Sequence, residues 1–118
     1  MNIHPTAIIS PDATLADGVD VGPYSIIGGA SAVTKDIPPF VMASGNFAKL
    51  FGLNMIGLKR RGFTEETIAA LKEAYRIVFR SSLLLTAAIR KVEQQVEDLP
   101  EVQQFLDFIR KSERGVCR

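Results

Sequence analysis

The sequence predicts a mixed fold: a short parallel β-helix of about two coils at residues 1–40, followed by an extended exit and a three-helix domain at residues 41–118. Two periodicities support this expectation. Aliphatic residues recur at every sixth position near the N-terminus, which is typical of β-helical solenoids. Later in the chain, apolar residues recur at the three- and four-residue spacing of amphipathic helices. The composition, 47% hydrophobic and 23% charged, is that of a globular protein.

The six-residue period is unbroken over the first third of the chain. Its aliphatic positions are Ile3, Ile9, Leu15, Val21, Ile27 and Val33. Positions four residues later are mostly small, and turn formers such as Asp17-Gly18 and Gly22-Pro23 fall between them. We therefore expect one aliphatic side chain per hexad to point to the axis of a narrow coil, with three hexads in each coil. Two coils are too thin to fold alone, so other parts of the chain or further copies must cover them.

Two adjacent prolines, Pro38 and Pro39, are expected to end the ladder because proline cannot donate a backbone hydrogen bond. An extended exit is predicted at residues 40–46. Residues 50–62 then fit a short helix or a turn that ends at Gly62. This segment would connect the coil to the helical domain.

Three amphipathic helices are predicted after this connection. The first begins at the N-cap Thr64, since Glu65 and Glu66 in its first turn suit the positive end of the helix dipole. The second runs from about Thr86 to Leu99, and Pro100 suits the first position of the third. Their expected apolar faces are Ile68, Leu71, Tyr75, Val78 and Phe79, then Ile89, Val92, Val96 and Leu99, then Val102, Phe105, Leu106 and Ile109.

The composition and motifs exclude several kinds of site. One histidine and one cysteine, Cys117 near the chain end, offer no ligand cluster, so neither a metal nor another cofactor is expected. No phosphate-loop or dinucleotide glycine motif occurs. A net charge of +1 without a basic stripe between aromatic residues disfavours nucleic acid. No apolar run is long enough for a membrane span and no signal peptide begins the chain, so a cytoplasmic location is expected. Cys117 is expected to be a thiol without a role at a frayed end.

The most specific stretches are "IHPTAIISPDATLADGVDVGPYSIIG" at the start and, later, "GGASAVTKDIPPFVMASGN", "NMIGLKRRGFTEETIAALKEAYRIVFRS" and "LPEVQQFLDFIRKSERGVCR". The first resembles the N-terminal start of a bacterial UDP-N-acetylglucosamine O-acyltransferase, a hexapeptide-repeat acyltransferase. The others resemble the C-terminal portion of the same enzyme family. This resemblance implies a left-handed β-helix with a C-terminal helical domain, assembled as a homotrimer. It also implies transfer of a 3-hydroxyacyl group from acyl carrier protein to UDP-N-acetylglucosamine in lipid A biosynthesis, without a metal.

The resemblance further implies that the middle coils of the family are missing here, together with the histidine that serves as catalytic base. The seam falls at about Gly28-Gly29, where the start-like part meets the end-like part. Ile27 and Val33 remain six residues apart across it, as removal of whole coils requires. We expect an internal deletion that produced an engineered scaffold; a natural short relative is the alternative.

Three residues match the family's nucleotide-holding turn. By this resemblance, Asn54 contacts the uridine or ribose, and Arg60 and Arg61 contact the diphosphate, so weak binding of UDP is expected. Ile56 stands where many members have an acid, which removes one polar contact. The alternative is that the two arginines only complement a helix C-terminus before Gly62.

The second half of the chain is basic and offers a surface for an acidic partner. Residues 47–118 hold thirteen Lys and Arg against nine Asp and Glu, whereas residues 1–46 hold one lysine against four aspartates. Lys49, with Lys72, Arg76 and Arg80 on the first long helix, could meet acyl carrier protein, as the resemblance implies. Ordinary solvated helix charge is the alternative.

No catalytic residue is assigned. The only histidine, His4, lies in the first hexad beside Pro5 and is expected to be exposed at a turn. The aspartates Asp12, Asp17, Asp20 and Asp36 are expected at surface turns, where they cannot act as bases at neutral pH.

The predicted function is therefore an inactive, trimeric scaffold derived from the acyltransferase. Ile8, Ile26 and Val41 are expected to pack between subunits. An active minimal acyltransferase, or a binding module for acyl carrier protein or UDP-sugar, are the alternatives.

Overall fold

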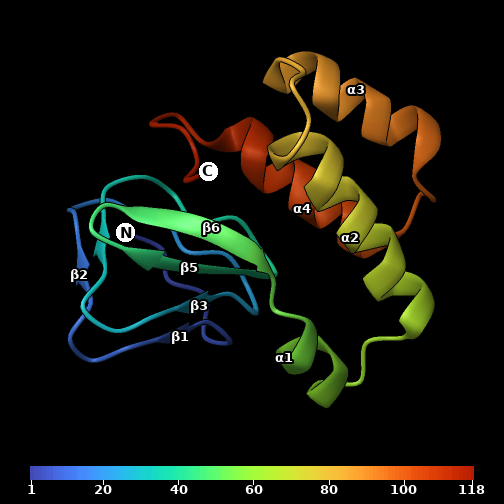
Figure 1. The fold of residues 1–118 in the computed structure, drawn as a ribbon. Coiled ribbons are helices and arrows are strands. Elements are labelled where there is room, and N and C mark those ends of the chain that lie inside the picture. The colour runs from blue at the N-terminus through green and yellow to red at the C-terminus, as the bar shows by residue number, and fades with distance from the viewer.

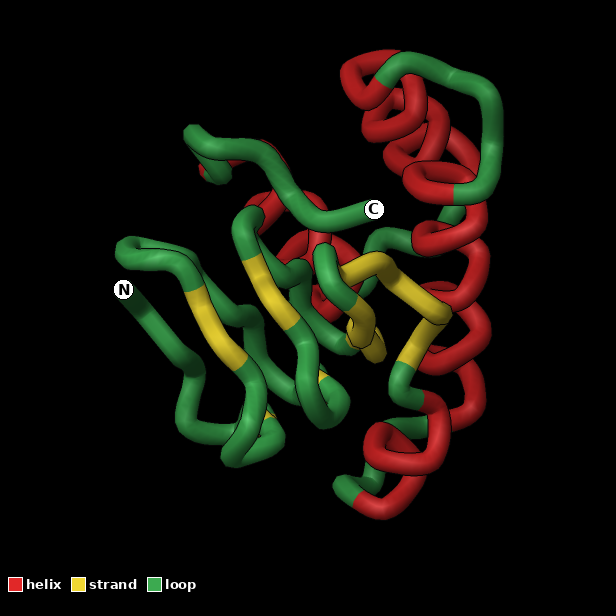
Figure 2. The backbone as a smooth tube through the Cα atoms, turned by 60° about the vertical axis from the view of Figure 1, so that its left-hand side comes forward, coloured by secondary structure: helices red, strands yellow, loops and turns green.

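The computed structural model describes residues 1–118, which form a stack of short strands covered by helices (Figure 1). The strands are β1 (Ile8–Ile9), β2 (Thr14–Leu15), β3 (Ile26–Ile27), β4 (Ala32–Val33), β5 (Val41–Gly45) and β6 (Ala48–Leu53). The helices are α1 (Met55–Arg60), α2 (Glu65–Phe79), α3 (Leu85–Gln95) and α4 (Pro100–Lys111). Figure 2 shows the first coil, the second coil and the β5–β6 hairpin as successive layers, with α2 beyond the hairpin.

The first two coils pair in parallel with a spacing of eighteen residues on three faces. The pairs are Ile3 with Val21, Ile8–Ile9 with Ile26–Ile27, and Thr14–Leu15 with Ala32–Val33. Three hexads therefore make one coil, as the six-residue period predicts. The inward residues of the second coil, Val21, Ile27 and Val33, are at most 2% exposed. Ile3 of the first coil is 44% exposed, because nothing is stacked below it.

Small residues are needed at the corners of this coil. The buried hydroxyls of Ser25 and Ser31 donate to the carbonyl oxygens of Gly22 and Gly28, each at 2.7 Å, and so satisfy backbone groups inside the corner. A Cβ atom added to Gly22 would lie 2.5 Å from the backbone nitrogen of Pro39. The next layer thus approaches the Gly22 corner too closely for any side chain.

The ladder does not end at Pro38 and Pro39, which corrects the prediction. Val21 pairs with Ile37, and β3 pairs in parallel with β5, so Ile26 faces Met42. The prolines lie at a corner between these pairs, where the amide of Phe40 donates to Pro23 O at 2.9 Å. The pairing distance is eighteen residues at Leu15–Val33 but sixteen at Val21–Ile37 and again at Ile26–Met42, so the chain loses two residues of its period between Val33 and Ile37 although pairing continues. The division of the chain at residue 40 stays a prediction.

Strand β6 was not predicted, since the sequence indicated a helix or turn over much of it. β6 pairs antiparallel with β5, and its other edge is met by groups distant in the sequence. The amide of Leu50 donates to Arg118 O at 3.1 Å, and Arg80 Nη2 donates to Leu50 O at 2.7 Å. Leu50 and Leu53 are buried. These tertiary partners, rather than local propensity, place the segment in the sheet.

The helices follow the predicted caps. Thr64 Oγ1 accepts from the amide of Thr67 at 3.1 Å and caps α2, and Pro100 is the first residue of α4. α3 ends at Gln95 rather than near Leu99. Four helices are present where three were predicted; the additional one is the short α1, which the sequence left open as a helix or turn.

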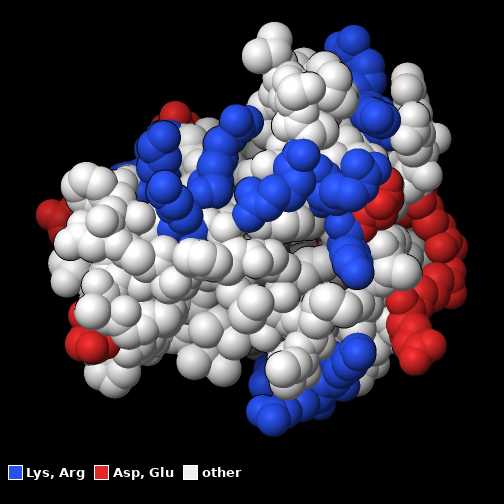
Figure 3. Space-filling model, in the orientation of Figure 1, with Lys and Arg blue, Asp and Glu red and all other residues white.

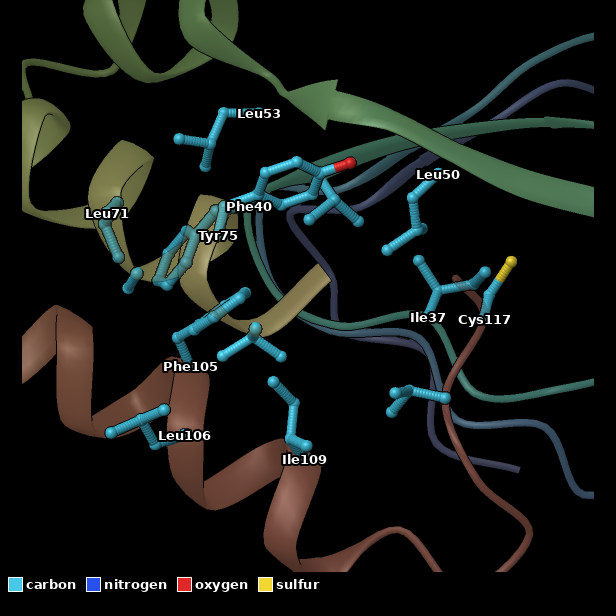
Figure 4. Packing of buried hydrophobic residues seen from close by; sticks show 14 of the residues in the cluster. Ile37, Phe40, Leu50, Leu53, Leu71, Tyr75, Phe105, Leu106, Ile109 and Cys117 are labelled. Atoms are coloured by element: carbon cyan, nitrogen blue, oxygen red, sulfur yellow. The ribbon is translucent and has the colours of Figure 1, made fainter. Parts of the chain in front are cut away.

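One apolar core joins the coil to the helices. Ile37 and Phe40 of the coil, Leu50 and Leu53 of β6, and residues of α2 and α4 converge in it (Figure 4). The predicted helix faces are buried at Ile68, Leu71, Tyr75 and Val78 of α2 and at Val102, Phe105, Leu106 and Ile109 of α4, whereas Phe79 is partly buried. The helices thus cover the coil as expected. No helix is both long and apolar enough to span a membrane.

The C-terminal tail packs on the coil, which corrects two predictions. Val116 pairs with Asp36, and Cys117 is 5% exposed, with its Sγ donating to Ala48 O at 2.8 Å. Burial raises the pKa of the Cys117 thiol. Asp36 is 4% exposed, not at a surface turn, because the tail covers it and Ser112 Oγ donates to its carboxylate at 2.6 Å.

Candidate functional site

A hollow of about 700 Å³ opens between α1 and the outer face of the sheet; we call it the α1 hollow. Its lining residues come from the coil, the hairpin and α1: Thr6, Ile8, Tyr24, Ile26, Met42, Leu53, Asn54, Met55, Ile56, Gly57, Arg60 and Arg61. Figure 3 shows a broad face without charged side chains over β1, β3 and β5, with basic groups gathered by α1 below it. The three site residues predicted from the sequence therefore lie together at this hollow.

The side chain of Asn54 is fully engaged within the protein. Its Oδ1 accepts from the amide of Gly57 at 3.1 Å as the N-cap of α1, and its Nδ2 donates to Tyr24 O at 3.0 Å. The residue is only 5% exposed. Asn54 therefore fixes α1 against the corner of the second coil. A contact with a nucleotide stays a prediction.

Arg60 and Arg61 are exposed and belong to the last turn and the C-cap of α1. The Arg61 guanidinium lies 5.2 Å from the centre of the Tyr24 ring, within reach of a cation–π contact. Neither arginine has a carboxylate within ion-pair distance. Both cations can therefore meet an anion in the hollow, although they also complement the C-terminal end of a short helix.

The basic stripe on α2 is partly neutralised. Lys72, Arg76 and Arg80 are exposed at four-residue spacing, and Figure 3 shows Lys and Arg as a band across this face. Arg76 forms an ion pair with Glu73. Arg80 Nη2 donates to the Tyr75 hydroxyl at 2.7 Å and to Leu50 O of β6. These two hydrogen bonds fix the position of the Arg80 guanidinium group. Of the predicted basic surface, only Arg76 has a carboxylate partner; Arg80 donates to uncharged groups, and Lys49 and Lys72 form no ion pair.

The structure does not bring the only histidine to the α1 hollow. His4 is exposed, as predicted, and its Nδ1 accepts from the amide of Thr6 at 3.2 Å. It lines a different hollow, of about 580 Å³, beside Asp20 and Lys111. The α1 hollow has no histidine, aspartate or glutamate in its lining. No three His, Cys, Asp or Glu side chains gather to hold a metal.

Sequence reasoning missed the residues that the third turn brings to the hollow. Val41 was expected on the outer face, but it is fully buried, and Met42 at 37% exposure is the outward residue. The shortened turn pairs Met42, rather than Val41, with Ile26. Ile8 and Ile26 were expected on this outer face from the sequence, but no local signal marks Met42.

These features define the class of protein as a hexapeptide-repeat β-helix protein. They are a parallel coil with an eighteen-residue repeat, a helical C-terminal part and a hollow with two unpaired arginines. Residues 36–117 match the family model described as UDP N-acetylglucosamine O-acyltransferase, domain 2. The chain therefore belongs to the UDP-N-acetylglucosamine O-acyltransferase family, as the resemblance predicts.

Relatives support this assignment over most of the chain. An acyl-[acyl-carrier-protein]–UDP-N-acetylglucosamine O-acyltransferase from Thermodesulfovibrio yellowstonii is 54% identical over 88 residues, which cover 75% of this chain and 34% of that protein. One from Aliivibrio salmonicida is 43% identical over 118 residues, all of this chain and 45% of that protein. The chain thus spans about half the length of the curated relatives it matches, or less.

Solved structures agree with this fold. A UDP-N-acetylglucosamine acyltransferase from Bacteroides fragilis superposes with a TM-score of 0.95 at 42% identity, over 98% of this chain and 46% of that chain. The corresponding enzyme from Arabidopsis superposes with a TM-score of 0.91 at 32% identity, over 98% of this chain and 44% of that one. The coil and the helices therefore have the arrangement found in this family.

Proposed function

We propose that the chain is a trimeric scaffold of this family that lacks the middle coils and does not catalyse acyl transfer. Its relatives bear the name of acyltransferases that use acyl carrier protein and UDP-N-acetylglucosamine. The family reaction would transfer a 3-hydroxyacyl group in lipid A biosynthesis. Residual binding of those two partners, a left-handed coil and a cytoplasmic location stay predictions from the family.

An internal deletion is supported by the regular join at Gly28-Gly29. Ile27 pairs with Ile9 before this point and Val33 pairs with Leu15 after it, both with the eighteen-residue spacing of a full coil. The amide of Gly28 also donates to Ala43 O at 2.9 Å, so the next layer stacks on the join. Removal of whole coils leaves such a join, because each coil presents the same backbone ladder to its neighbour.

The proposal that the chain does not catalyse acyl transfer rests on which side chains line the α1 hollow. Acyl transfer to a sugar hydroxyl needs a base that takes the hydroxyl proton, and histidine suits this role near neutral pH. No histidine, aspartate or glutamate lines the hollow, and His4 lies in another one. Loss of a general base alone slows such reactions by about 10²–10⁴-fold. Loss of the cleft walls adds a cost in positioning.

We expect no acyl transfer above background when acyl carrier protein loaded with a 3-hydroxyacyl group is mixed with UDP-N-acetylglucosamine and the chain. The product is measured by mass spectrometry, with an intact family member as positive control. Turnover that disappears in His4→Ala would contradict the proposal and make His4 a relocated base. Turnover that persists in His4→Ala would instead support a minimal acyltransferase with another base.

The uncharged outer face supports a trimer. Ile8 is 62% exposed, Met42 is 37% exposed, and Ile26 lies half-buried between them on paired strands. Contiguous exposed apolar residues on a sheet commonly mark an interface between proteins. The first coil alone also leaves Ile3 44% exposed, so the short coil has little core of its own.

Light scattering after size exclusion should give three times the chain mass of 12.9 kDa. Ile8→Glu should dissociate the assembly, because it places three charges in the apolar contact. Leu84→Glu is the matched control, since Leu84 is 83% exposed on the α2–α3 connection, and it should leave the mass unchanged. A folded monomer at micromolar concentration would contradict the proposed trimer.

A further inference from the structure

We infer that the connection between α2 and α3, residues 80–84, docks onto a bilayer surface that contains anionic lipids. These residues are too few to cross a bilayer, so the contact is peripheral. The connection is separate from the α1 hollow and from the sheet face of Ile8, Ile26 and Met42 that is proposed to join subunits. The inference goes beyond the proposed function and does not rest on it.

Two adjacent leucines of this connection lack an apolar partner within the chain. Leu84 is the most exposed of the large hydrophobic side chains, at 83%, and Leu83 before it is 36% exposed. Leu85, the first residue of α3, is partly buried and packs on the core. The connection is thus attached to the core by one leucine and presents the two preceding leucines to solvent.

Hydrogen bonds at both ends fix the backbone of this connection. Ser81 Oγ donates to Ile77 O of α2 at 2.5 Å and accepts from the amide of Leu83 at 3.3 Å. On the other side, the amide of Ala88 donates to Leu84 O at 2.8 Å in the first turn of α3. Leu84 is therefore held outward in one conformation, and its insertion into a bilayer requires little further ordering of the backbone.

The charge beside the two leucines is positive. Residues 81–89 are uncharged, whereas Arg80 precedes them and Arg90 and Lys91 follow them. None of these three cations has a carboxylate within ion-pair distance. Figure 3 shows an uncharged tip at the top of the molecule, where α2 connects to α3 in Figure 1, with Lys and Arg side chains beside it.

The nearest acids along the chain do not neutralise this charge. Glu73 forms an ion pair with Arg76, and Glu93 forms one with Arg110. Single exposed leucines are ordinary on protein surfaces, so the informative feature is their position between cations that remain unpaired. The connection therefore combines an apolar tip with a positive base.

A bilayer with anionic lipids matches both parts of this surface. Its negative surface attracts the three cations, and the leucines reach the boundary between headgroups and acyl chains. A nucleic acid would attract the same cations, but its phosphate backbone offers no apolar layer for Leu83 and Leu84. A projecting tip, as Figure 3 shows it, enters a fluid layer without needing a complementary pocket.

Cosedimentation with vesicles measures this contact. The chain should bind an equal mixture of phosphatidylcholine and phosphatidylglycerol at least tenfold more tightly than phosphatidylcholine alone, because each cation gains at the charged surface. Arg90→Gln combined with Lys91→Gln should weaken this binding at least tenfold. Lys59→Gln combined with Lys111→Gln is the matched control, since it removes two exposed lysines without ion pairs elsewhere on the chain, and the affinity should change less than twofold.

Insertion of the tip has its own signal. The chain contains no tryptophan, so Leu84→Trp provides a single reporter. Its fluorescence should shift to the blue with the mixed vesicles, and brominated lipids should quench it, because the indole ring moves from water to the acyl boundary. Phe51→Trp is the matched control, since Phe51 is 65% exposed on β6, and its emission should not shift.

Leu84→Glu should weaken binding to the mixed vesicles at least tenfold, because it places a charge at the acyl boundary. The mass of the assembly should stay unchanged in this variant, which separates loss of the membrane contact from dissociation of subunits. Absence of sedimentation with the mixed vesicles, or equal binding by Leu84→Glu and the wild-type chain, would overturn the inference.

Two further results would also overturn it. Sedimentation with an unshifted Leu84→Trp emission would leave the leucines to a protein partner rather than a bilayer. Equal losses in the two double substitutions would reduce the contact to attraction by net charge. Neither result bears on the proposed loss of catalysis or on the trimer, which the acyl-transfer assay and light scattering address.

Discussion

Replacing Phe40 with alanine is expected to lower the free energy of unfolding by about 3–5 kcal/mol. The Phe40 ring is fully buried, and its centre lies 6.1 Å from that of Tyr24 and 5.8 Å from that of Phe63. It thus joins the coil to the segment between α1 and α2. Phe40 has a φ of 70°, which is unfavourable for phenylalanine and alanine alike. The substitution relieves no backbone strain that would offset the cavity.

The measurement is urea unfolding at one fixed protein concentration, because assembly contributes to apparent stability. Phe51→Ala is the control: Phe51 is 65% exposed on β6, so its loss should change the free energy by less than about 0.5 kcal/mol. If Phe40→Ala and Phe51→Ala unfold at the same urea concentration, the aromatic contact does not hold the coil to the helical part.

Replacing Asp36 with alanine is expected to lower the free energy of unfolding by about 2–4 kcal/mol, because two hydrogen-bond donors lose their acceptor in a buried site. Asp36 Oδ1 accepts from the amide of Asp20 at 2.9 Å, and Oδ2 accepts from Ser112 Oγ at 2.6 Å. Arg114 Nε lies 3.7 Å from Oδ1. The carboxylate therefore holds the C-terminal tail against the second coil.

Loss of this link should also expose the tail. Cys117 is buried, so its alkylation by iodoacetamide should be slow in the wild-type chain and faster in Asp36→Ala. Asp36→Asn keeps one acceptor oxygen and should have a smaller effect on both readouts. Asp12→Ala is the matched control, since Asp12 is exposed but also accepts from a neighbouring coil at Ala30 N, 3.0 Å away. Equal losses in Asp36→Ala and Asp12→Ala would show that burial of Asp36 has no special role.

These two contacts explain how a coil this short is held in a folded chain. Phe40 connects the third turn to the segment before α2, and Asp36 connects the second coil to the tail after α4. Both lie within a few residues of the point between Val33 and Ile37 where the period is lost. The helical part thus contacts the coil at its last layers. The inward residues of these layers are less exposed to solvent than those of the first coil.

The sequence by itself determined the features that depend on local chemistry. The hexad period predicted the inward residues Val21, Ile27 and Val33, because each coil must place one aliphatic side chain on its axis per face. Thr64 and Pro100 predicted two helix starts, because caps act on adjacent amides. The motifs also carried the family assignment.

Only the tertiary structure decided the features that depend on contacts between distant segments. The third turn, strand β6 and the burial of Asp36 and Cys117 arise because α2 and the tail satisfy backbone and side-chain groups far away in the chain. The α1 hollow likewise forms from three segments, and the outward position of Met42 follows from a turn that is two residues shorter between Val33 and Ile37. Residue spacing reports which side chains share a face, but hydrogen-bond partners and packing across the core determine which faces meet.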